Sequence, residues 1–243
     1  MRQVLEGIRI ADFSHVMAGP YATHLLRLLG AEVIKIEAPG RGDAMRYYGT
    51  DRRYDGLAPA FIAVNAGKKS IVLDLKKPED LEQARALVGR CDVLVENFRP
   101  GVMKRLGLDY DALRAINPGL VYCSISGYGQ AGPKSDRPSY APVVQAASGY
   151  EMAHFSFQDG LDQPANTGLY AADILASAYA TIAILTGLLQ RSRTGRGDYL
   201  DVSLMESILS VMINEFQFAQ FPSPRRYGGA QGAEHCSAHR ARS

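Results

Sequence analysis

Short apolar runs alternate along the chain with segments whose apolar residues recur at helical spacing. The runs are rich in Val and Ile and nearly continuous, which is typical of strands buried on both faces of a parallel sheet. This alternation predicts an α/β fold: an open, mainly parallel, Rossmann-like sheet with helices on both faces. The predicted strands are GIRIADFS, AEVIKIE, KSIVLDL, CDVLVENF and GLVYCSIS, at residues 7–14, 31–37, 69–75, 91–98 and 119–126, and helices are predicted at 21–29, 78–90 and 109–117.

The loops that follow the predicted strands carry most of the candidate chemistry. They read FSHVMAGP, EAPGRGD, LDLKK, ENFRPG and SGYGQAGP, and they are rich in Gly, Pro, Asn and basic residues. In open parallel sheets, ligands bind at the carboxyl ends of the strands. Turn formation explains any one of these loops, but together they favour a site for a large, phosphate-bearing ligand.

Polar side chains in these loops have two interpretations each. Arg99 is the most suggestive, because a guanidinium at a strand end binds phosphate through paired hydrogen bonds. His15 is either a polar residue whose hydrogen bonds are satisfied or a site residue. The loop cations for which surface charge is the alternative are Lys68, Lys69, Lys76, Arg99 and Arg105.

A long apolar segment begins with a single acid. Asp173 is the only charged residue from residue 168 until Arg191. The sequence leaves two roles open for it, the N-cap of a helix or a nucleophile. The uncharged run 174–190 is shorter than the roughly 20 apolar residues of a membrane-spanning helix. A buried core helix is therefore the preferred interpretation.

Composition narrows the class of protein. The 243 residues are 47% hydrophobic and 21% charged, with a net charge of +2, which does not favour a nucleic-acid partner. The odd number of widely spaced cysteines suits a reducing, cytoplasmic environment without disulfides. Charges interrupt the apolar residues of the N-terminus, so we expect neither a signal peptide nor a membrane partner.

Familiar cofactor and hydrolase motifs do not fit. GYGQAG at residues 127–132 matches the dinucleotide fingerprint in letters, but Pro133 and a turn-like stretch follow where a helix should start. The chain contains no HExxH, CxxC or GxSxG motif. His235, Cys236 and His239 lack a fourth ligand at a suitable spacing. We therefore expect no metal and no permanently bound cofactor.

Several motifs, in order along the chain, resemble one family. LEGIRIADFSHVMAGPYATHLLRLLGAEVIKIE and GRGDAMR are followed by NAGKKSIVLDLKKPE, DVLVENFRPGVMKRLGL, NPGLVYCSISGYGQAGP and TGRGDYLDVSLMESIL. Together they resemble the class III CoA-transferases, the family named after carnitine CoA-transferase and bile-acid-inducible protein F. The resemblance covers roughly residues 5–220 and includes formyl-CoA transferases and 2-methylacyl-CoA racemases.

The resemblance implies an enzyme that moves CoA from an acyl-CoA to a free carboxylate. It implies a catalytic aspartate before the RSRTGRG motif. Asp173 lies 21 residues before Thr194, which is the spacing in the family, and no other acid lies between Asp173 and the motif. A carboxyl with the ordinary pKa of about 3.9 is ionised at neutral pH and needs no general base. The implied route runs through an aspartyl anhydride and an aspartyl-CoA thioester.

The same resemblance implies a set of contacts to CoA, which would be a substrate. Basic members of the set would meet phosphates, Phe98 and Leu73 would flank adenine or pantetheine, and Tyr140 would lie close to the thioester. The implied CoA-binding residues are His15, Ala18, Leu73, Lys76, Asn97, Phe98, Arg99, Arg105 and Tyr140.

Three positions depart from relatives within that family. Met17 and Ala38 stand where formyl-CoA transferases have a glutamine and an arginine, which disfavours formyl or oxalate as the substrate. Tyr140 stands where racemases have a histidine, so two-base proton exchange is less favoured than transfer. The alternatives are a racemase-like enzyme or a truncated chain that binds CoA without turnover.

The resemblance also implies a domain organisation. We expect a CoA-binding α/β large domain at 1–200, a long helix or linker at 201–224 and an atypical, disordered tail at 225–243. The family's smaller second domain would be largely absent. Family members form an interlocked homodimer, which is not favoured for a chain of this length.

Overall fold

A single parallel sheet organises the chain in the computed structural model, which describes residues 3–49, 52–156, 158, 160–164, 168–213 and 215. Within those residues the sheet has six strands in the order β3-β2-β1-β4-β5-β6, and every neighbouring pair is parallel. The strands are β1 (Arg9–Asp12), β2 (Glu32–Glu37), β3 (Lys69–Val72), β4 (Val93–Glu96), β5 (Val121–Ser126) and β6 (Tyr199–Ser203).

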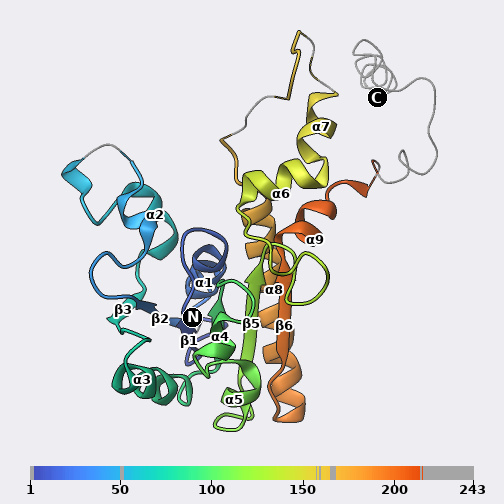
Figure 1. Ribbon diagram of the computed structural model, residues 1–243. Coiled ribbons are helices and arrows are strands. Elements are labelled where there is room, and N and C mark those ends of the chain that lie inside the picture. Colours follow the sequence, from blue (N-terminus) through green and yellow to red (C-terminus); the bar gives the residue numbers. More distant parts are fainter. Residues whose placement is uncertain are drawn as a thin grey trace.

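Helices cover both faces of this sheet (Figure 1). One core joins the sheet to α1 (Ala18–Leu28), α6 (Ala141–Ser148), α8 (Ala171–Thr194) and α9 (Leu204–Leu209). The other joins it to α3 (Pro78–Val88), α4 (Val102–Arg105) and α5 (Tyr110–Arg114). The remaining elements of the described chain are η1 (Ala44–Tyr47), η2 (Arg52–Tyr54), α2 (Pro59–Asn65) and α7 (Tyr150–Phe155).

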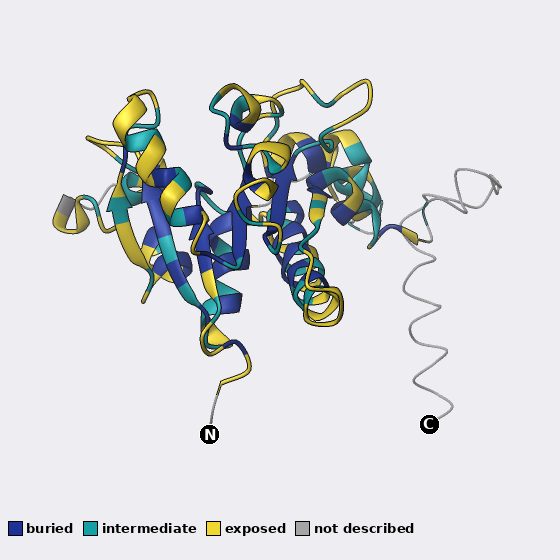
Figure 2. Cartoon of the chain, turned by 90° about the horizontal axis from the view of Figure 1, so that it is seen from below, coloured by how far each residue is buried: buried dark blue, intermediate teal, exposed yellow. Residues whose placement is uncertain are grey.

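The central strands are apolar because both of their faces are covered. Every residue of β4 and β5 is buried, whereas the edge strand β3 is largely exposed. Figure 2 shows this contrast as a buried centre between exposed flanks. The predicted fold class and all five predicted strands are confirmed. The strand order reverses between β1 and β4, which is where ligands bind in sheets of this type.

The sixth strand was not predicted, and it spans the expected boundary at residue 200. β6 runs from Tyr199 to Ser203 and pairs with the whole length of β5. The short helix α9 follows β6 directly, and Ser203 caps that helix by accepting a hydrogen bond from the Glu206 backbone N–H. The predicted tail at 225–243 lies outside the described residues.

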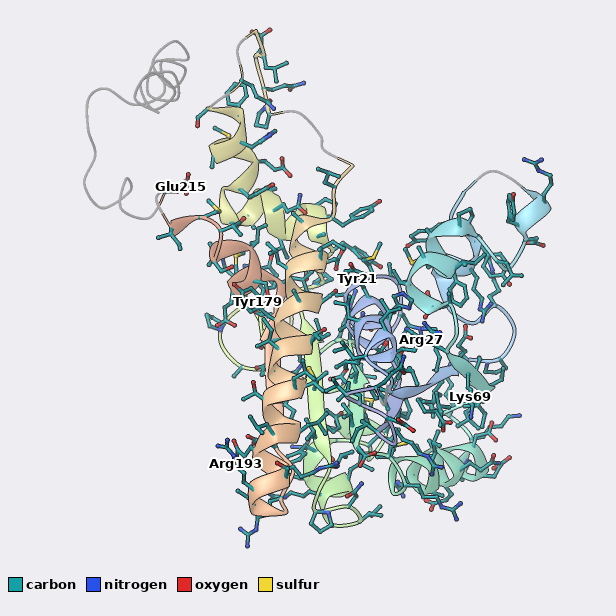
Figure 3. All side chains as sticks on the ribbon, turned by 180° about the vertical axis from the view of Figure 1, so that it is seen from behind. Tyr21, Arg27, Lys69, Tyr179, Arg193 and Glu215 are labelled. Carbon is teal, nitrogen blue, oxygen red and sulfur yellow. The ribbon has the colours of Figure 1, made fainter. Side chains whose placement is uncertain are left out.

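The lone acid Asp173 lies in the first turn of α8, but it is not the N-cap. The N-cap position belongs to Tyr170, which makes no side-chain cap bond, so the N-cap interpretation of Asp173 was wrong. At its other end α8 is anchored by Arg191, whose Nη1 lies 2.9 Å from the Asp92 carboxylate. Tyr179, labelled in Figure 3, donates a hydrogen bond of 2.8 Å from α8 to Ser210 beyond α9.

The environment of α8 fits a core helix. By length and composition it is the one helix in the described chain that is long and apolar enough to cross a membrane. In the fold, however, it packs against α1, β5, β6 and α9. Small residues make this close packing possible: a Cβ added at Gly187 would lie 3.0 Å from the Val121 side chain.

Candidate active site

A cavity of about 210 Å³ opens at the carboxyl ends of β1, β4 and β5. It lies at the switch in strand order, between the start of α1 and the start of α8. Half of the residues predicted for the site line it together, although they come from widely separated parts of the sequence. These residues are His15, Ala18, Asn97, Tyr140 and Asp173.

Asp173 contributes a carboxylate that no described residue neutralises. None of the hydrogen bonds or ion pairs found among the described residues involves its side-chain oxygens. Burial raises the pKa of Asp173 to about 6. The helix N-terminus favours the ionised form, but burial outweighs it here. The side chain is thus a poorly hydrated carboxylate facing a cavity, which is a suitable environment for a nucleophile.

This raised pKa predicts how the rate of any reaction that uses the Asp173 carboxylate should fall at low pH. Burial favours the neutral acid, so protonation should remove the nucleophile below a pH of about 6. We expect kcat/KM to fall about tenfold per pH unit below that value. A pH profile with acyl-CoA as the varied substrate measures it. A limb near the ordinary carboxyl value of about 4 would contradict the inferred burial.

The loop after β1 is joined to the loop after β4. The backbone N–H of His15 donates to Asn97 Oδ1, and Asn97 Nδ2 donates to the His15 carbonyl, both at 2.7 Å. The His15 ring meets the Phe98 ring edge-on, with centroids 5.2 Å apart. Burial and the nearby Lys35 lower the pKa of His15. The cavity therefore has a neutral imidazole on a wall fixed across the switch point.

Five predicted CoA contacts do not line this cavity, and one of them, Phe98, packs against the His15 ring. The Leu73 side chain is 3% exposed and packs in the core beneath β3 rather than at the surface. Lys76 is exposed in the turn before α3, and Arg105 is exposed at the end of α4. Arg99 lines a separate cavity of about 380 Å³. Their contacts to CoA remain predictions.

The second cavity lies beside α4 and α5, on the face of the sheet opposite α8. Tyr110, Tyr122 and Tyr199 pack together there, with ring centroids 5.6 to 6.1 Å apart. Burial raises the pKa of Glu96, at the base of the cavity, to about 7. Because Glu96 and Asn97 are neighbours in sequence, the end of β4 contributes one side chain to each cavity.

Sequence reasoning missed a buried ionic network beneath the site. Asp12, at the end of β1, accepts hydrogen bonds from Thr23 Oγ1 at 2.7 Å and from Lys68 Nζ at 2.9 Å. Lys35 Nζ lies 3.0 Å from the Asp43 carboxylate. All four charged side chains are almost completely buried. Lys68 is therefore neither a surface charge nor a ligand contact.

One sequence signal could have revealed part of this network. Lys35 interrupts the apolar run AEVIKIE at a position that a buried strand would fill with an apolar residue. A lysine there needs a buried acid as a partner. The sequence does not indicate that Asp43, in a glycine-rich loop, is this partner. No group of three or more His, Cys, Asp or Glu residues suited to a metal is present in the part of the chain that the structure describes.

Comparisons of the sequence with known proteins identify one family. The sequence model of CoA-transferase family III matches residues 5–242. The chain is 40% identical to succinyl-CoA:glutarate CoA-transferase of Mus musculus, over 94% of this chain and 52% of that protein. It is 43% identical to acetyl-CoA:oxalate CoA-transferase of Acetobacter aceti, over 85% and 52% of the two chains. The chain thus spans about half the length of the curated relatives it matches.

Solved structures give the same picture. A CaiB/BaiF family protein of Brucella suis superposes with a TM-score of 0.84 at 36% identity, covering 94% of this chain and 61% of that one. An aspartate-to-alanine mutant of Rv3272 from Mycobacterium tuberculosis superposes with a TM-score of 0.79 at 33% identity, covering 90% and 58%.

Proposed function

The chain belongs to CoA-transferase family III, and we propose that it transfers CoA from an acyl-CoA to a free carboxylate with Asp173 as the nucleophile. The observation that carries this proposal is the unneutralised carboxylate of Asp173 at the cavity. The cavity sits at the topological switch point, which is the expected position for a ligand. The resemblance of the sequence motifs to this family independently points to the same aspartate.

The proposed reaction balances without a proton donor or acceptor. The Asp173 carboxylate attacks the thioester carbonyl, the carbon–sulfur bond breaks, and CoA leaves as a thiolate with the electron pair. The resulting mixed anhydride is attacked by the thiolate at the aspartyl carbonyl, which releases the first carboxylate and leaves an aspartyl-CoA thioester. The acceptor carboxylate then repeats these two steps in reverse, so that a new acyl-CoA forms and Asp173 is regenerated.

The binding proposal divides the predicted residues between the two ends of CoA. His15, Ala18, Asn97 and Tyr140 line the cavity with Asp173 and would surround the thioester. Exposed cations outside the cavity would bind the phosphates. Tyr140 is 69% exposed, so it is accessible to a ligand that enters from solvent. The cations in this proposal are Lys76, Arg99 and Arg105.

The names of related enzymes suggest which acids to test first as acceptors. Their printed names include glutarate, succinate, oxalate and citramalate, all of which are acids with more than one carboxylate. We propose this class of acceptor for this chain. Met17 lines the cavity. Its apolar side chain cannot make the hydrogen bonds of the glutamine that formyl-CoA transferases have at this position, which disfavours oxalate.

Trapping of the covalent intermediate tests the function directly. The chain is incubated with succinyl-CoA and then with hydroxylamine, which converts an aspartyl anhydride or thioester into an aspartyl hydroxamate. We expect peptide mass spectrometry to locate the modification on Asp173. Free CoA in place of succinyl-CoA should give no modification. The carboxylate of Asp201, at the opposite side of β5, is an internal control and should remain unmodified.

The trapping experiment, combined with a binding and exchange assay that uses labelled CoA, distinguishes the two candidate functions. The second candidate is a chain that binds CoA without transferring it. Binding of labelled CoA with neither a hydroxamate on Asp173 nor exchange of label into succinyl-CoA would favour that candidate. Exchange of label together with the hydroxamate would establish transfer.

A further inference from the structure

The turn between β1 and α1 contains a strained residue. Val16 has a φ of 64° and is the one non-glycine residue with a positive φ among those the structure describes. A β-branched side chain is disfavoured there, at a cost of roughly 1–2 kcal/mol. Such a conformation persists only where the surroundings impose it. Val16 also lines the cavity that contains Asp173.

Asp43 and Lys35 impose this conformation from beneath the turn. The Val16 N–H donates to both Asp43 oxygens, at 3.1 and 3.2 Å. Lys35 Nζ pairs with the same carboxylate and donates to the Ser14 carbonyl at 2.7 Å. Asp43 is completely buried. This ion pair therefore holds the backbone at two positions, Ser14 and Val16.

Further contacts hold the turn on the side that faces α8. Ser177 Oγ lies 2.7 Å from the Ala18 carbonyl, and Ser177 is one helical turn beyond Asp173. The side chain of Asn97 binds both backbone groups of His15. The wall of the cavity opposite Asp173 is thus fixed from three directions. Only the Asp43 contact acts at the strained residue itself.

We propose that Asp43 and Lys35 are positioning residues for the transfer reaction: they hold Val16 in its left-handed conformation and thereby fix the cavity wall that faces Asp173. This inference rests on the proposed function. It differs from a purely structural role, in which Asp43 serves only to start η1 by accepting from the Met45 N–H at 2.9 Å.

Glycine at position 16 separates these two roles. Asp43→Asn should let Val16 relax and should lower kcat/KM about 100-fold, the effect of a displacement of about 1 Å at a reacting centre. Val16→Gly alone should lower kcat/KM less than Asp43→Asn does, because glycine adopts a positive φ without strain. In the double variant, glycine keeps the turn accessible without Asp43, so about tenfold of the lost kcat/KM should return.

Additive effects of the two substitutions would overturn the inference, because a structural role of Asp43 at η1 does not depend on the residue at position 16. Glu32→Gln is the control: it breaks the ion pair with Lys69, which lies at the amino ends of β2 and β3, away from the cavity. It should leave kcat/KM unchanged. If Asp43→Asn does not fold, Lys35→Met enters the same cycle, since it leaves Asp43 with two backbone donors.

Hydrogen exchange distinguishes this inference from the proposed function. The amide of Val16 should exchange faster in Asp43→Asn than in the wild type, whether or not the chain turns over. No hydroxamate on wild-type Asp173, together with this faster exchange, would reject the function and retain the positioning of the turn. A normal wild-type reaction with unchanged exchange in Asp43→Asn would reject the positioning alone.

Discussion

Asp173→Asn is expected to lower the transfer of labelled CoA between succinyl-CoA and an acceptor acid by a factor on the order of 10⁴ or more. An amide cannot attack the thioester to form an anhydride, and no other carboxylate among the described residues lines the cavity. Asp173→Glu retains the charge but displaces it by one methylene, so it should lose about 100-fold. Isotope exchange measured under identical conditions compares the two variants. Transfer at the wild-type rate by Asp173→Asn would end the proposed mechanism.

The loss of activity should not reflect a loss of folding. The folded-state pKa of Asp173, about 6, lies above its unfolded value. The ionised carboxylate therefore destabilises the fold, with no effect below a pH of about 4 and the full effect above about 6. Asp173→Asn removes this charge and should gain about 1–3 kcal/mol of unfolding free energy at pH 7. Urea denaturation at pH 7 and pH 4 measures the difference.

Lys68→Met is expected to lower the free energy of unfolding by about 3–5 kcal/mol, because it leaves the buried Asp12 carboxylate without its main partner. Lys68 Nζ also donates to the Pro20 carbonyl and to Asn65 Oδ1, at 2.8 and 2.9 Å. Burial alone would raise the pKa of Asp12, but Lys68, Lys35 and Ser14 hold it well below its ordinary value. The stabilisation should therefore be lost as the pH falls below the ordinary carboxyl range.

The adjacent lysine provides a matched control for this prediction. Lys69 lies on the edge strand β3 (Figure 3) and pairs with Glu32, but its side chain is 66% exposed. Lys69→Met should change the free energy of unfolding by less than about 1 kcal/mol. Urea denaturation of both variants gives the comparison. Equal effects of the two substitutions would contradict the special role of the buried pair.

The contrast between these two lysines shows what the sequence could and could not predict. Apolar periodicity located the first five strands, because burial on both faces leaves a continuous pattern. It missed β6, where an edge strand mixes polar and apolar residues, and it could not distinguish Lys68 from Lys69. Burial of a charge depends on partners that are distant in sequence, and Asp12 and Lys68 meet only after the sheet has formed.

The residues of the candidate site were also predicted only in part from the sequence. The catalytic role of Asp173 and the four predicted CoA contacts that line its cavity were implied by the resemblance of the sequence motifs to a known family. The strained conformation of Val16 left no trace in the sequence, because valine ordinarily avoids it. The raised pKa of Asp173 could not be predicted from the sequence either. A carboxyl at a helix start is expected to have a lowered pKa, and only the burial seen in the fold raises it.

The ion pair at the C-terminal end of α8 limits which insertions and deletions this helix can accept. Arg191 fixes the helix at the amino ends of the strands, and Asp173 stands at the opposite end. Both residues belong to one continuous helix, so the number of residues between them fixes their relative position. Inserting a single residue would rotate Asp173 by about 100° and raise it by about 1.5 Å, away from the cavity. An insertion or deletion between Asp173 and Arg191 would therefore displace the candidate nucleophile, whereas a substitution on the exposed face of this helix would not.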